Sequence, residues 1–393
     1  MKGFHVKGFR AAGVHCGVKK VRKDLAVIVS DVPCVAAGLF TTNRVKAPSV
    51  LFSSRRVASG SARGVVVNSG NANVSTGGFG RHVVERMAAA TEKAVGAEPG
   101  EVLVCQTGVI GVAPPLEKIE AGIERAAARL APSGLVAAAE AMRTTDAFSK
   151  TALLRGGIGG VEVTVAGIAK GAGMISPRMA TMLAFFLTDA RLSPPALRRA
   201  LKAAVSASFN RIVVDGDQST NDTVLAFANG LAGGPLLTAG CAAFAEFVEA
   251  LSSVARELAL MIVRDGEGAT KVVTVDVRGA ATDGEAEKAA RKLACSPLVK
   301  TAFFGCDPNW GRFMAALGDS GARFDPDEVD LYYNGVQVVR RGLDAGAGKE
   351  AARALREDTV EVIVELGAGG GSYRLWTCDL TDEYVRINSS YRS

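Results

Sequence analysis

The residues best suited to chemistry lie between positions 167 and 186, where a glycine-rich turn with one lysine leads to a threonine. A strand-like run ends at Lys170-Gly171-Ala172-Gly173, and after a proline-containing loop Ala180 and Thr181 precede a strongly apolar run. Three interpretations compete: a phosphate-binding loop, a tight turn that leads into a core strand, and a nucleophile at the start of a buried strand. The first is weak because Lys170 precedes the glycines, whereas a phosphate loop has the order GxxxxGK[ST].

The third interpretation has a chemical logic. A threonine hydroxyl is a weak nucleophile unless a base activates it. If the bond between Ala180 and Thr181 is cut, Thr181 acquires a free α-amine, whose reference pKa is ~7.7–8.0. This amine can act as general base for the hydroxyl of the same residue. The cut can be autocatalytic, since Oγ can attack the Ala180 carbonyl and form an ester that water then releases.

Histidine, the commonest general base, is scarce in this chain. Only His5, His15 and His82 occur, and none lies in an HExxH motif or beside a GxSxG motif. His82 stands at the start of an alanine-rich helical stretch and is expected on the surface. An enzyme built from this sequence therefore needs another base.

The composition is that of an ordinary globular protein. Hydrophobic residues make up 48% and charged residues 22% of the 393 residues, a length that suggests two to three domains. The net charge of +6 is spread along the chain, and its densest basic stretch, residues 19–23, is expected to be a solvated turn. Aromatic residues are only 6%, so we expect no nucleic-acid partner. No apolar run reaches the ~18 residues that cross a bilayer and no signal-peptide core is present, so we expect a cytoplasmic protein without a membrane partner.

Neither the cysteines nor the aspartates form a metal motif. The seven cysteines include no CxxC pair, which favours buried free thiols in a reducing compartment over structural zinc. Asp215, Asp217 and Asp222 superficially resemble a calcium loop, but Ser219-Thr220 interrupts the EF-hand pattern. We therefore expect a hydrogen-bonded turn there and no metal.

The elements that must position these residues form an α/β (α+β) fold. Short β-branched runs at 25–29, 64–68, 161–165, 271–277 and 359–364 predict strands, and alanine-rich runs at 83–95, 116–131, 194–208 and 242–264 predict helices. Since these elements do not alternate strictly, we expect a layered mixed-sheet domain rather than a Rossmann fold or a barrel. A loop at 279–284 followed by a helix at 285–295 suggests domains at 1–280 and 281–393.

The segment from Lys170 to Phe186 closely resembles the signature of the ornithine acetyltransferase / glutamate N-acetyltransferase family of arginine biosynthesis. The resemblance covers nearly the whole chain. The other matching stretches lie, in order, at residues 40–47, 67–73, 107–111, 144–146, 215–223, 265–271, 307–312 and 384–393.

This resemblance implies that the precursor cuts itself before Thr181 into an α chain, 1–180, and a β chain, 181–393. Thr181, in an N-terminal-nucleophile-like site, would take acetyl from N²-acetylornithine and release ornithine. The acetyl-Thr181 ester would then pass the acetyl group to glutamate in a ping-pong mechanism. Some members also accept acetyl-CoA as donor. The family needs no metal or other cofactor, and its members suggest an assembly of two α and two β chains.

The resemblance also assigns roles to individual residues. Thr107 and Gly108 match the pair that forms the oxyanion hole, although alone they would indicate a β-turn. The positions that match substrate contacts are Thr144, Lys170, Thr181, Glu267, Asn388 and the terminal Ser393. Of these, Glu267 would hold the amino end of the substrate, and Thr145 is a weaker candidate than its neighbour Thr144.

Two other classes of function remain open from the sequence. An N-terminal-nucleophile amidase or aminopeptidase could use the same cleavage and pass the acyl group to water. A non-catalytic binding protein would keep its chain intact, and a denaturing gel distinguishes this case from the other two.

Overall fold

The computed structural model describes residues 3–176 and 182–390, so the predicted cleavage site at Ala180 and Thr181 and the terminal Ser393 lie outside the described residues. The chain divides into two compact units. The first consists of Met1–Gly171, Pro177–Asn210 and Gln218–Ile262, and the second of Ala172–Ser176, Arg211–Asp217 and Val263–Ser393. The main boundary thus lies before the expected position of 280. The reason is that the strand at 272–280 belongs to the sheet of the second unit.

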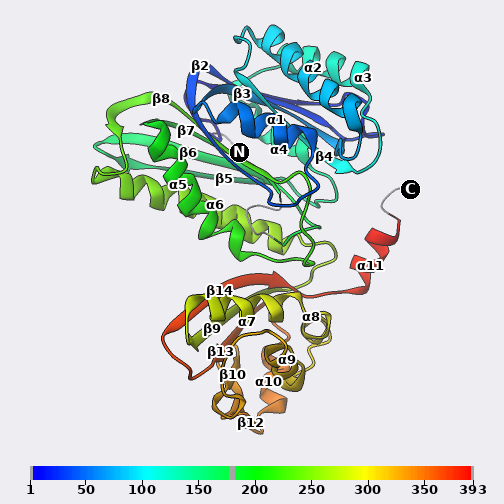
Figure 1. Cartoon of the computed structure of the whole chain (residues 1–393), viewed down its shortest axis with the longest axis vertical. Helices are drawn as coiled ribbons and strands as arrows, with labels where there is room; N and C mark the ends of the chain where they lie inside the picture. The colour runs from blue at the N-terminus through cyan, green and yellow to red at the C-terminus, as the bar shows by residue number, and fades with distance from the viewer. Residues whose placement is uncertain (1–2, 177–181, 391–393) are drawn as a thin grey trace. The chain divides into compact units, whose positions relative to one another are not determined.

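The first unit contains an eight-stranded mixed sheet (Figure 1). Seven strands have the order β4-β3-β2-β8-β7-β6-β5, and β1 pairs with β2. The β3–β4 and β7–β8 pairs are parallel, and the other pairs are antiparallel. The strands are β1 (Phe9–Val14), β2 (Leu25–Phe40), β3 (Ser61–Asn71), β4 (Val102–Val109), β5 (Lys150–Ile158), β6 (Val161–Lys170), β7 (Leu183–Leu192) and β8 (Thr223–Leu237).

Helices cover both faces of this sheet (Figure 1). Successive strand residues point to opposite faces: Ala26 and Ile28 of β2 pack in one core with α4, whereas Leu25 and Val27 pack in another with α2 and α3. The layered α/β fold expected from the sequence is therefore confirmed. The helices are α1 (Pro48–Val57), α2 (Gly77–Val95), α3 (Leu116–Ala127), α4 (Leu135–Met142), α5 (Pro194–Ser206) and α6 (Ala243–Arg264).

The predicted strands and helices are present, but several bounds differ. The strand predicted at 25–29 continues as β2 to Phe40, through an irregularity between Val29 and Cys34 that the local sequence does not reveal. The helix predicted at 116–131 ends at Ala127, because Ala131 forms a bridge with Ala11 of β1. Both differences arise from tertiary contacts, which override local propensity.

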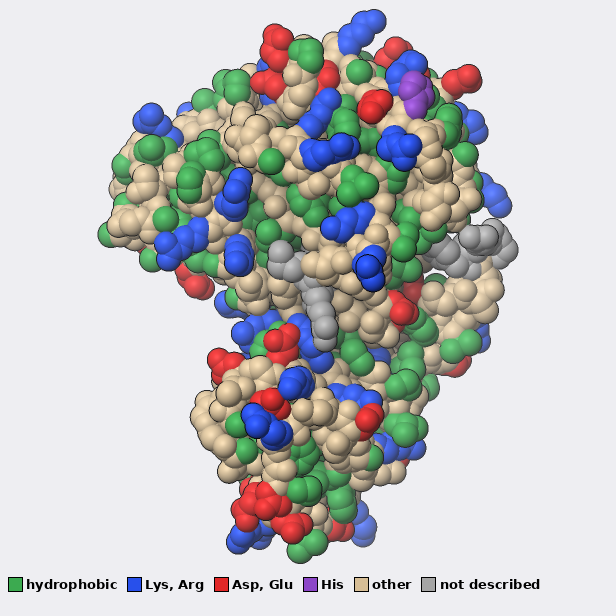
Figure 2. Space-filling model, in the orientation of Figure 1, with side chains coloured by type: hydrophobic (Ala, Val, Ile, Leu, Met, Phe, Trp, Pro, Cys, Tyr) green, Lys and Arg blue, Asp and Glu red, His purple; other side chains and the backbone are tan. Residues whose placement is uncertain are grey.

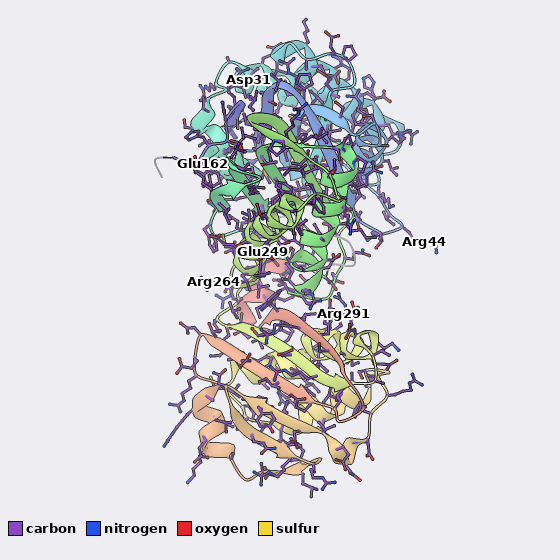
Figure 3. The ribbon with its side chains drawn as sticks, turned by 90° about the vertical axis from the view of Figure 1, so that its left-hand side faces the viewer. Asp31, Arg44, Glu162, Glu249, Arg264 and Arg291 are labelled. Atoms are coloured by element: carbon purple, nitrogen blue, oxygen red, sulfur yellow. The ribbon has the colours of Figure 1, made fainter. Side chains whose placement is uncertain are left out.

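The second unit contains a six-stranded sheet with the order β12-β11-β10-β13-β9-β14. Its core includes Val273, Val275 and Val277 of β9, which are fully buried on one face beside residues of α7. Arg291, labelled in Figure 3, reaches from α7 to β14, where its guanidinium donates to the Tyr373 hydroxyl at 3.1 Å. The elements are β9 (Val272–Ala280), α7 (Asp283–Cys295), α8 (Pro297–Phe304), α9 (Trp310–Gly318), β10 (Asp330–Tyr333), β11 (Val336–Arg340), β12 (Leu343–Asp344), α10 (Gly348–Ala354), β13 (Thr359–Glu365), β14 (Gly371–Cys378) and α11 (Asp382–Ser389).

The cysteines are free thiols, as expected: Cys16, Cys34, Cys105 and Cys378 are buried, and the other three are partly buried. His82 lies on the exposed side of α2, also as expected. None of the helices in the described part of the chain is both long and apolar enough to span a bilayer.

Candidate active site

Thr107 and Gly108 lie near the end of β4, beside the end of β3. Gly108 pairs with Gly70, and both glycines have positive φ angles, of 131° and 98°. A Cβ atom on Gly108 would lie 2.3 Å from the carbonyl carbon of Gly70, a distance that real side chains do not tolerate. The close approach of these two strand ends therefore needs a glycine at position 108, and the positive φ of Gly70 also favours glycine.

Lys170, the last residue of β6, is brought to the same place. Its side chain is buried, and Nζ donates a hydrogen bond to Oγ1 of Thr107 over 3.3 Å. In the sheet Lys170 lies opposite Leu183, the first residue of β7. The fold thus unites a threonine and a lysine that are 63 positions apart in the chain, both of which the sequence indicated as site residues.

Asp146 connects the other predicted residue of this region, Thr144, to the end of β6. Its buried carboxylate accepts hydrogen bonds from the Thr144 N–H at 2.8 Å, from the Gly171 N–H at 2.7 Å and from Lys150 Nζ at 2.7 Å. Burial alone would raise the pKa of this carboxyl. The ammonium groups of Lys150 and Lys170, together with the hydrogen bonds, outweigh burial and hold the pKa well below its usual range. Asp146 is therefore a fixed negative charge between two lysines.

Asp222 is a second buried carboxyl in the first unit, one residue before β8. Its neighbour Thr223 donates a backbone hydrogen bond to the carbonyl of Met182 at 2.9 Å, which places Asp222 close to the start of β7. Among the described residues, Oδ2 of Asp222 has no hydrogen-bond partner, although it is buried. Burial raises the pKa of this carboxyl well above its usual value, despite the hydrogen bond with Ser219 and the charge of Lys170.

The turn that contains Asp215 belongs to the second unit. Its carboxylate accepts backbone hydrogen bonds from Met174 at 2.5 Å, Ile175 at 2.9 Å and Asp217 at 3.1 Å. The hydrogen-bonded turn expected here is confirmed for this residue. Within the described residues, no group of three or more His, Cys, Asp or Glu side chains is arranged to hold a metal ion.

Glu267 and Asn388, predicted to contact substrate, meet in the second unit. Nδ2 of Asn388, in the last turn of α11, donates to Oε2 of Glu267 at 2.7 Å. The Glu267 backbone N–H donates to the carbonyl of Ala172 at 2.9 Å, and a Cβ atom on Gly173 would lie 2.4 Å from the Glu267 carboxyl. A side chain at position 173 would therefore displace the Glu267 carboxylate from its present place.

The basic stretch 19–23 differs from the solvated turn that the sequence predicted. Lys20, Val21 and Arg22 are exposed, but Lys19 is partly buried, and its ammonium donates to the carbonyls of Lys23 at 3.0 Å and of Arg143. The reason is Asp24, a buried carboxylate that accepts the backbone N–H groups of this loop and turns Lys19 inward. Sequence reasoning missed Asp24. The only sequence signal for its role was the presence of an aspartate directly before a buried strand.

On the face of the first unit that Figure 2 shows, the Lys and Arg side chains of the described residues are spread out and form no single band. A surface hollow of about 370 Å³ in this unit contains none of the predicted site residues that the structure describes. It is lined by Ser59, Gly60, Pro194, Pro195, Arg198, Arg199 and Lys202.

Comparison with known proteins decides the family. The model of the ArgJ family matches residues 10–393. The chain belongs to the ArgJ family. The resemblance noted in the sequence is thereby confirmed, and as an ArgJ protein the chain is an acyltransferase of arginine biosynthesis.

Similar proteins support this assignment over the full length. The chain is 49% identical over 392 residues to the arginine biosynthesis bifunctional protein ArgJ of Geobacter sulfurreducens, covering 99% of this chain and 100% of that relative. It is 50% identical over 390 residues to the ArgJ protein of Symbiobacterium thermophilum, covering 98% and 97%. The crystal structure of ArgJ from Bacillus halodurans is similar with a TM-score of 0.52 and 44% identity, covering 54% of this chain and 100% of that chain.

Proposed function

We propose that this ArgJ protein transfers acetyl from N²-acetylornithine to glutamate, through an acetyl ester on Thr181. The products are ornithine and N-acetylglutamate. The observation that carries the proposal is the contact between Lys170 and Thr107, which joins a buried cation to a potential oxyanion donor at the end of the sheet. The chemistry needs both groups close to the nucleophile, and Thr181 follows Lys170 by eleven residues in the sequence.

The nucleophile requires cleavage of the chain between Ala180 and Thr181. In the proposed reaction Oγ of Thr181 attacks the Ala180 carbonyl, the peptide nitrogen leaves as the new α-amine, and water hydrolyses the resulting ester. The products are the chains 1–180 and 181–393. The α-amine then accepts the hydroxyl proton when Oγ attacks the acetyl group of the donor.

Thr107 and Gly108 are proposed to stabilise the oxyanion that forms in each half-reaction. A hydroxyl and a backbone N–H can both donate to this oxygen, and the loss of one such donor typically costs ~3–4 kcal/mol of transition-state stabilisation. The hydrogen bond from Lys170 to Oγ1 of Thr107 supports the assignment, because it occupies an acceptor position of the hydroxyl and leaves its proton available.

The remaining residues are proposed to bind the substrates. In the first unit, Thr144 and Lys170 would contact the substrate, with the lysine ammonium attracting its carboxylate. In the second unit, the carboxylate of Glu267 would hold the amino end, with Asn388 and Ser393 as further contacts. The hydrogen bond between Asn388 and Glu267 supports a shared role for these two residues.

Further properties of the family complete the proposal. We propose that no metal or other cofactor is needed, that acetyl-CoA serves as an additional donor, and that two α and two β chains assemble in the cytoplasm. The relatives from Geobacter sulfurreducens and Symbiobacterium thermophilum are both named bifunctional.

The proposal is tested by incubating the purified protein with N²-acetylornithine, with and without glutamate, and measuring ornithine and N-acetylglutamate. We expect at most one ornithine per active site without glutamate and continued turnover with it. Continued release of ornithine without glutamate would instead identify an amidase that passes the acetyl group to water. Thr181→Ala is the control, and we expect it to give a single uncleaved chain without transfer.

A further inference from the structure

The peptide group between Arg143 and Thr144 is held at both ends by charged side chains. Its carbonyl oxygen, on Arg143, accepts a hydrogen bond from Nζ of Lys19. Its N–H, on Thr144, donates to Oδ2 of Asp146 at 2.8 Å. The backbone that carries Thr144 is therefore fixed by one cation and one anion, and hydrogen bonds to charged groups are the stronger kind.

Lys19 is itself fixed by its surroundings. Its backbone N–H donates to Oδ2 of Asp24 at 2.8 Å, and the Asp24 side chain is fully buried. Its ammonium also donates to the carbonyl of Lys23 at 3.0 Å. The loop in which Lys20 and Arg22 are exposed thus fixes the orientation of the Lys19 side chain.

The stem of Lys19 packs beside the strand end that supports Gly108. A Cβ atom on Gly70 would lie 2.9 Å from Cγ of Lys19, so the lysine stem occupies the space that a side chain at position 70 would need. Gly70 in turn pairs with Gly108. Lys19 is therefore close to two groups of the proposed site. It binds the carbonyl next to the Thr144 backbone, and it packs against Gly70, the strand partner of Gly108.

We propose that Lys19 is a positioning residue of the acetyl-transfer site, which holds Thr144 in place through the carbonyl of Arg143. This inference rests on the proposed function, because it assumes that Thr144 contacts the substrate. It adds a residue that neither the sequence motifs nor the family resemblance indicated.

Lys19 also makes the site sensitive to alkaline pH. Burial lowers the pKa of its ammonium to about 8, while the carboxylates of Asp24 and Asp146 favour the charged form and Lys170 and Arg22 oppose it. As pH rises through this value the ammonium loses its charge, and its hydrogen bond to the Arg143 carbonyl weakens. We therefore expect the KM for N²-acetylornithine to rise above about pH 8.

The test compares Lys19→Met, Lys19→Arg and Lys20→Met, each in the cleaved enzyme that contains both chains, 1–180 and 181–393. We expect Lys19→Met to raise KM about tenfold at pH 7, as the loss of one charged hydrogen bond implies, with a smaller change in kcat. Lys19→Arg should restore most of the affinity and remove the alkaline rise in KM, because arginine stays protonated. Lys20→Met removes an exposed charge of the same stretch and should match the unaltered enzyme.

An α-amine has a reference pKa of ~7.7–8.0, close to this range. Because the α-amine of Thr181 would be present in every variant, the difference between variants is the relevant measurement. A Lys19→Met enzyme with unchanged KM, or a Lys19→Arg enzyme that keeps the alkaline rise in KM, would overturn the inference. The arginine variant keeps the charge, so it provides this answer even if the methionine variant does not fold. Absence of transfer by the unaltered protein would overturn the proposed function itself, together with this inference.

Discussion

Three ammonium groups, from Lys19, Lys150 and Lys170, interact with the one buried carboxylate of Asp146. Lys150 forms a direct ion pair with it at 2.7 Å, and both side chains are fully buried. Even when the Asp24 carboxylate beside Lys19 is included, the three cations outnumber the two anions. A region of this kind attracts an anionic ligand, and the proposed donor and acceptor both carry a carboxylate.

The first prediction concerns Lys170. We expect Lys170→Met to lower kcat/KM by roughly 10–100-fold, because it removes a charged hydrogen-bonding group while keeping the volume of the stem. Steady-state kinetics with N²-acetylornithine and glutamate provide the measurement. Chain cleavage and thermal unfolding are followed in parallel to separate activity from folding. Kinetics equal to those of the unaltered enzyme would show that Lys170 has only a structural role.

The second prediction concerns the buried carboxyl of Asp222. Its folded-state pKa is raised above the unfolded value of about 3.9, so the folded protein binds more protons and stability falls as pH rises from about 4 toward the raised pKa. Asp222→Asn removes this titration. We expect the Tm of the variant, relative to the unaltered protein, to increase with pH from about 4 upward and then level off. A Tm difference that does not vary with pH would contradict the raised pKa of the Asp222 carboxyl.

Individual residues show what sequence reasoning can and cannot provide. Asn388 lies beside Glu267, and Lys170 beside Thr107. Ordered motifs far apart in the chain indicate all four as site residues, but they do not say which of them meet. Lys19 was misjudged because a run of basic residues is usually solvated, and only the buried Asp24 reverses the direction of one of them. The contact of Asp146 with Gly171 depends on which strand ends meet, and no local pattern encodes this.

Strands and turns position these residues through backbone geometry. The strand cores were predictable because β-branched runs indicate buried strands, and β7 is almost entirely buried between neighbouring strands. The continuation of β2 to Phe40 was not predictable, because it depends on pairing with β8 and not on the local sequence. At the ends of β3 and β4, the close approach of Gly70 and Gly108 forms part of the proposed site.

The third prediction compares two glycines near the end of β4. Gly108→Ala would place Cβ 2.3 Å from the Gly70 carbonyl carbon, whereas Gly111 has a φ of 79° but no atom within 4 Å of an added Cβ. Gly111→Ala should therefore cost only the ~1–2 kcal/mol of a left-handed alanine. Gly108→Ala must also displace backbone and should cost clearly more. Urea unfolding measures both, and equal losses of stability would show that the close approach is unimportant.

In the whole molecule, each unit has its own sheet and its own buried core, and the second unit takes short segments from earlier in the chain. The sheet of the first unit contains strands from both sides of the proposed cleavage site in the sequence. β6 precedes this site and pairs with β7, which follows it, and β2 pairs with β8 in the same way.

The fourth prediction follows from this sheet topology. Because β7 and β8 lie between β2 and β6, cleavage between residues 180 and 181 leaves the two chains hydrogen-bonded within one sheet. We expect two bands on a denaturing gel but a single species that contains both chains in native mass spectrometry. Thr181→Ala should give the same native behaviour with one band. Separation of the two chains under native conditions would contradict the sheet order.

The central claim, acetyl transfer through the hydroxyl of Thr181, is tested most directly by intact mass spectrometry after brief exposure to N²-acetylornithine without glutamate. The account predicts two chains, 1–180 and 181–393, with one acetyl group on the second that fragmentation places at Thr181 and that glutamate removes. An uncleaved chain, or an acetyl group on another residue, would contradict it.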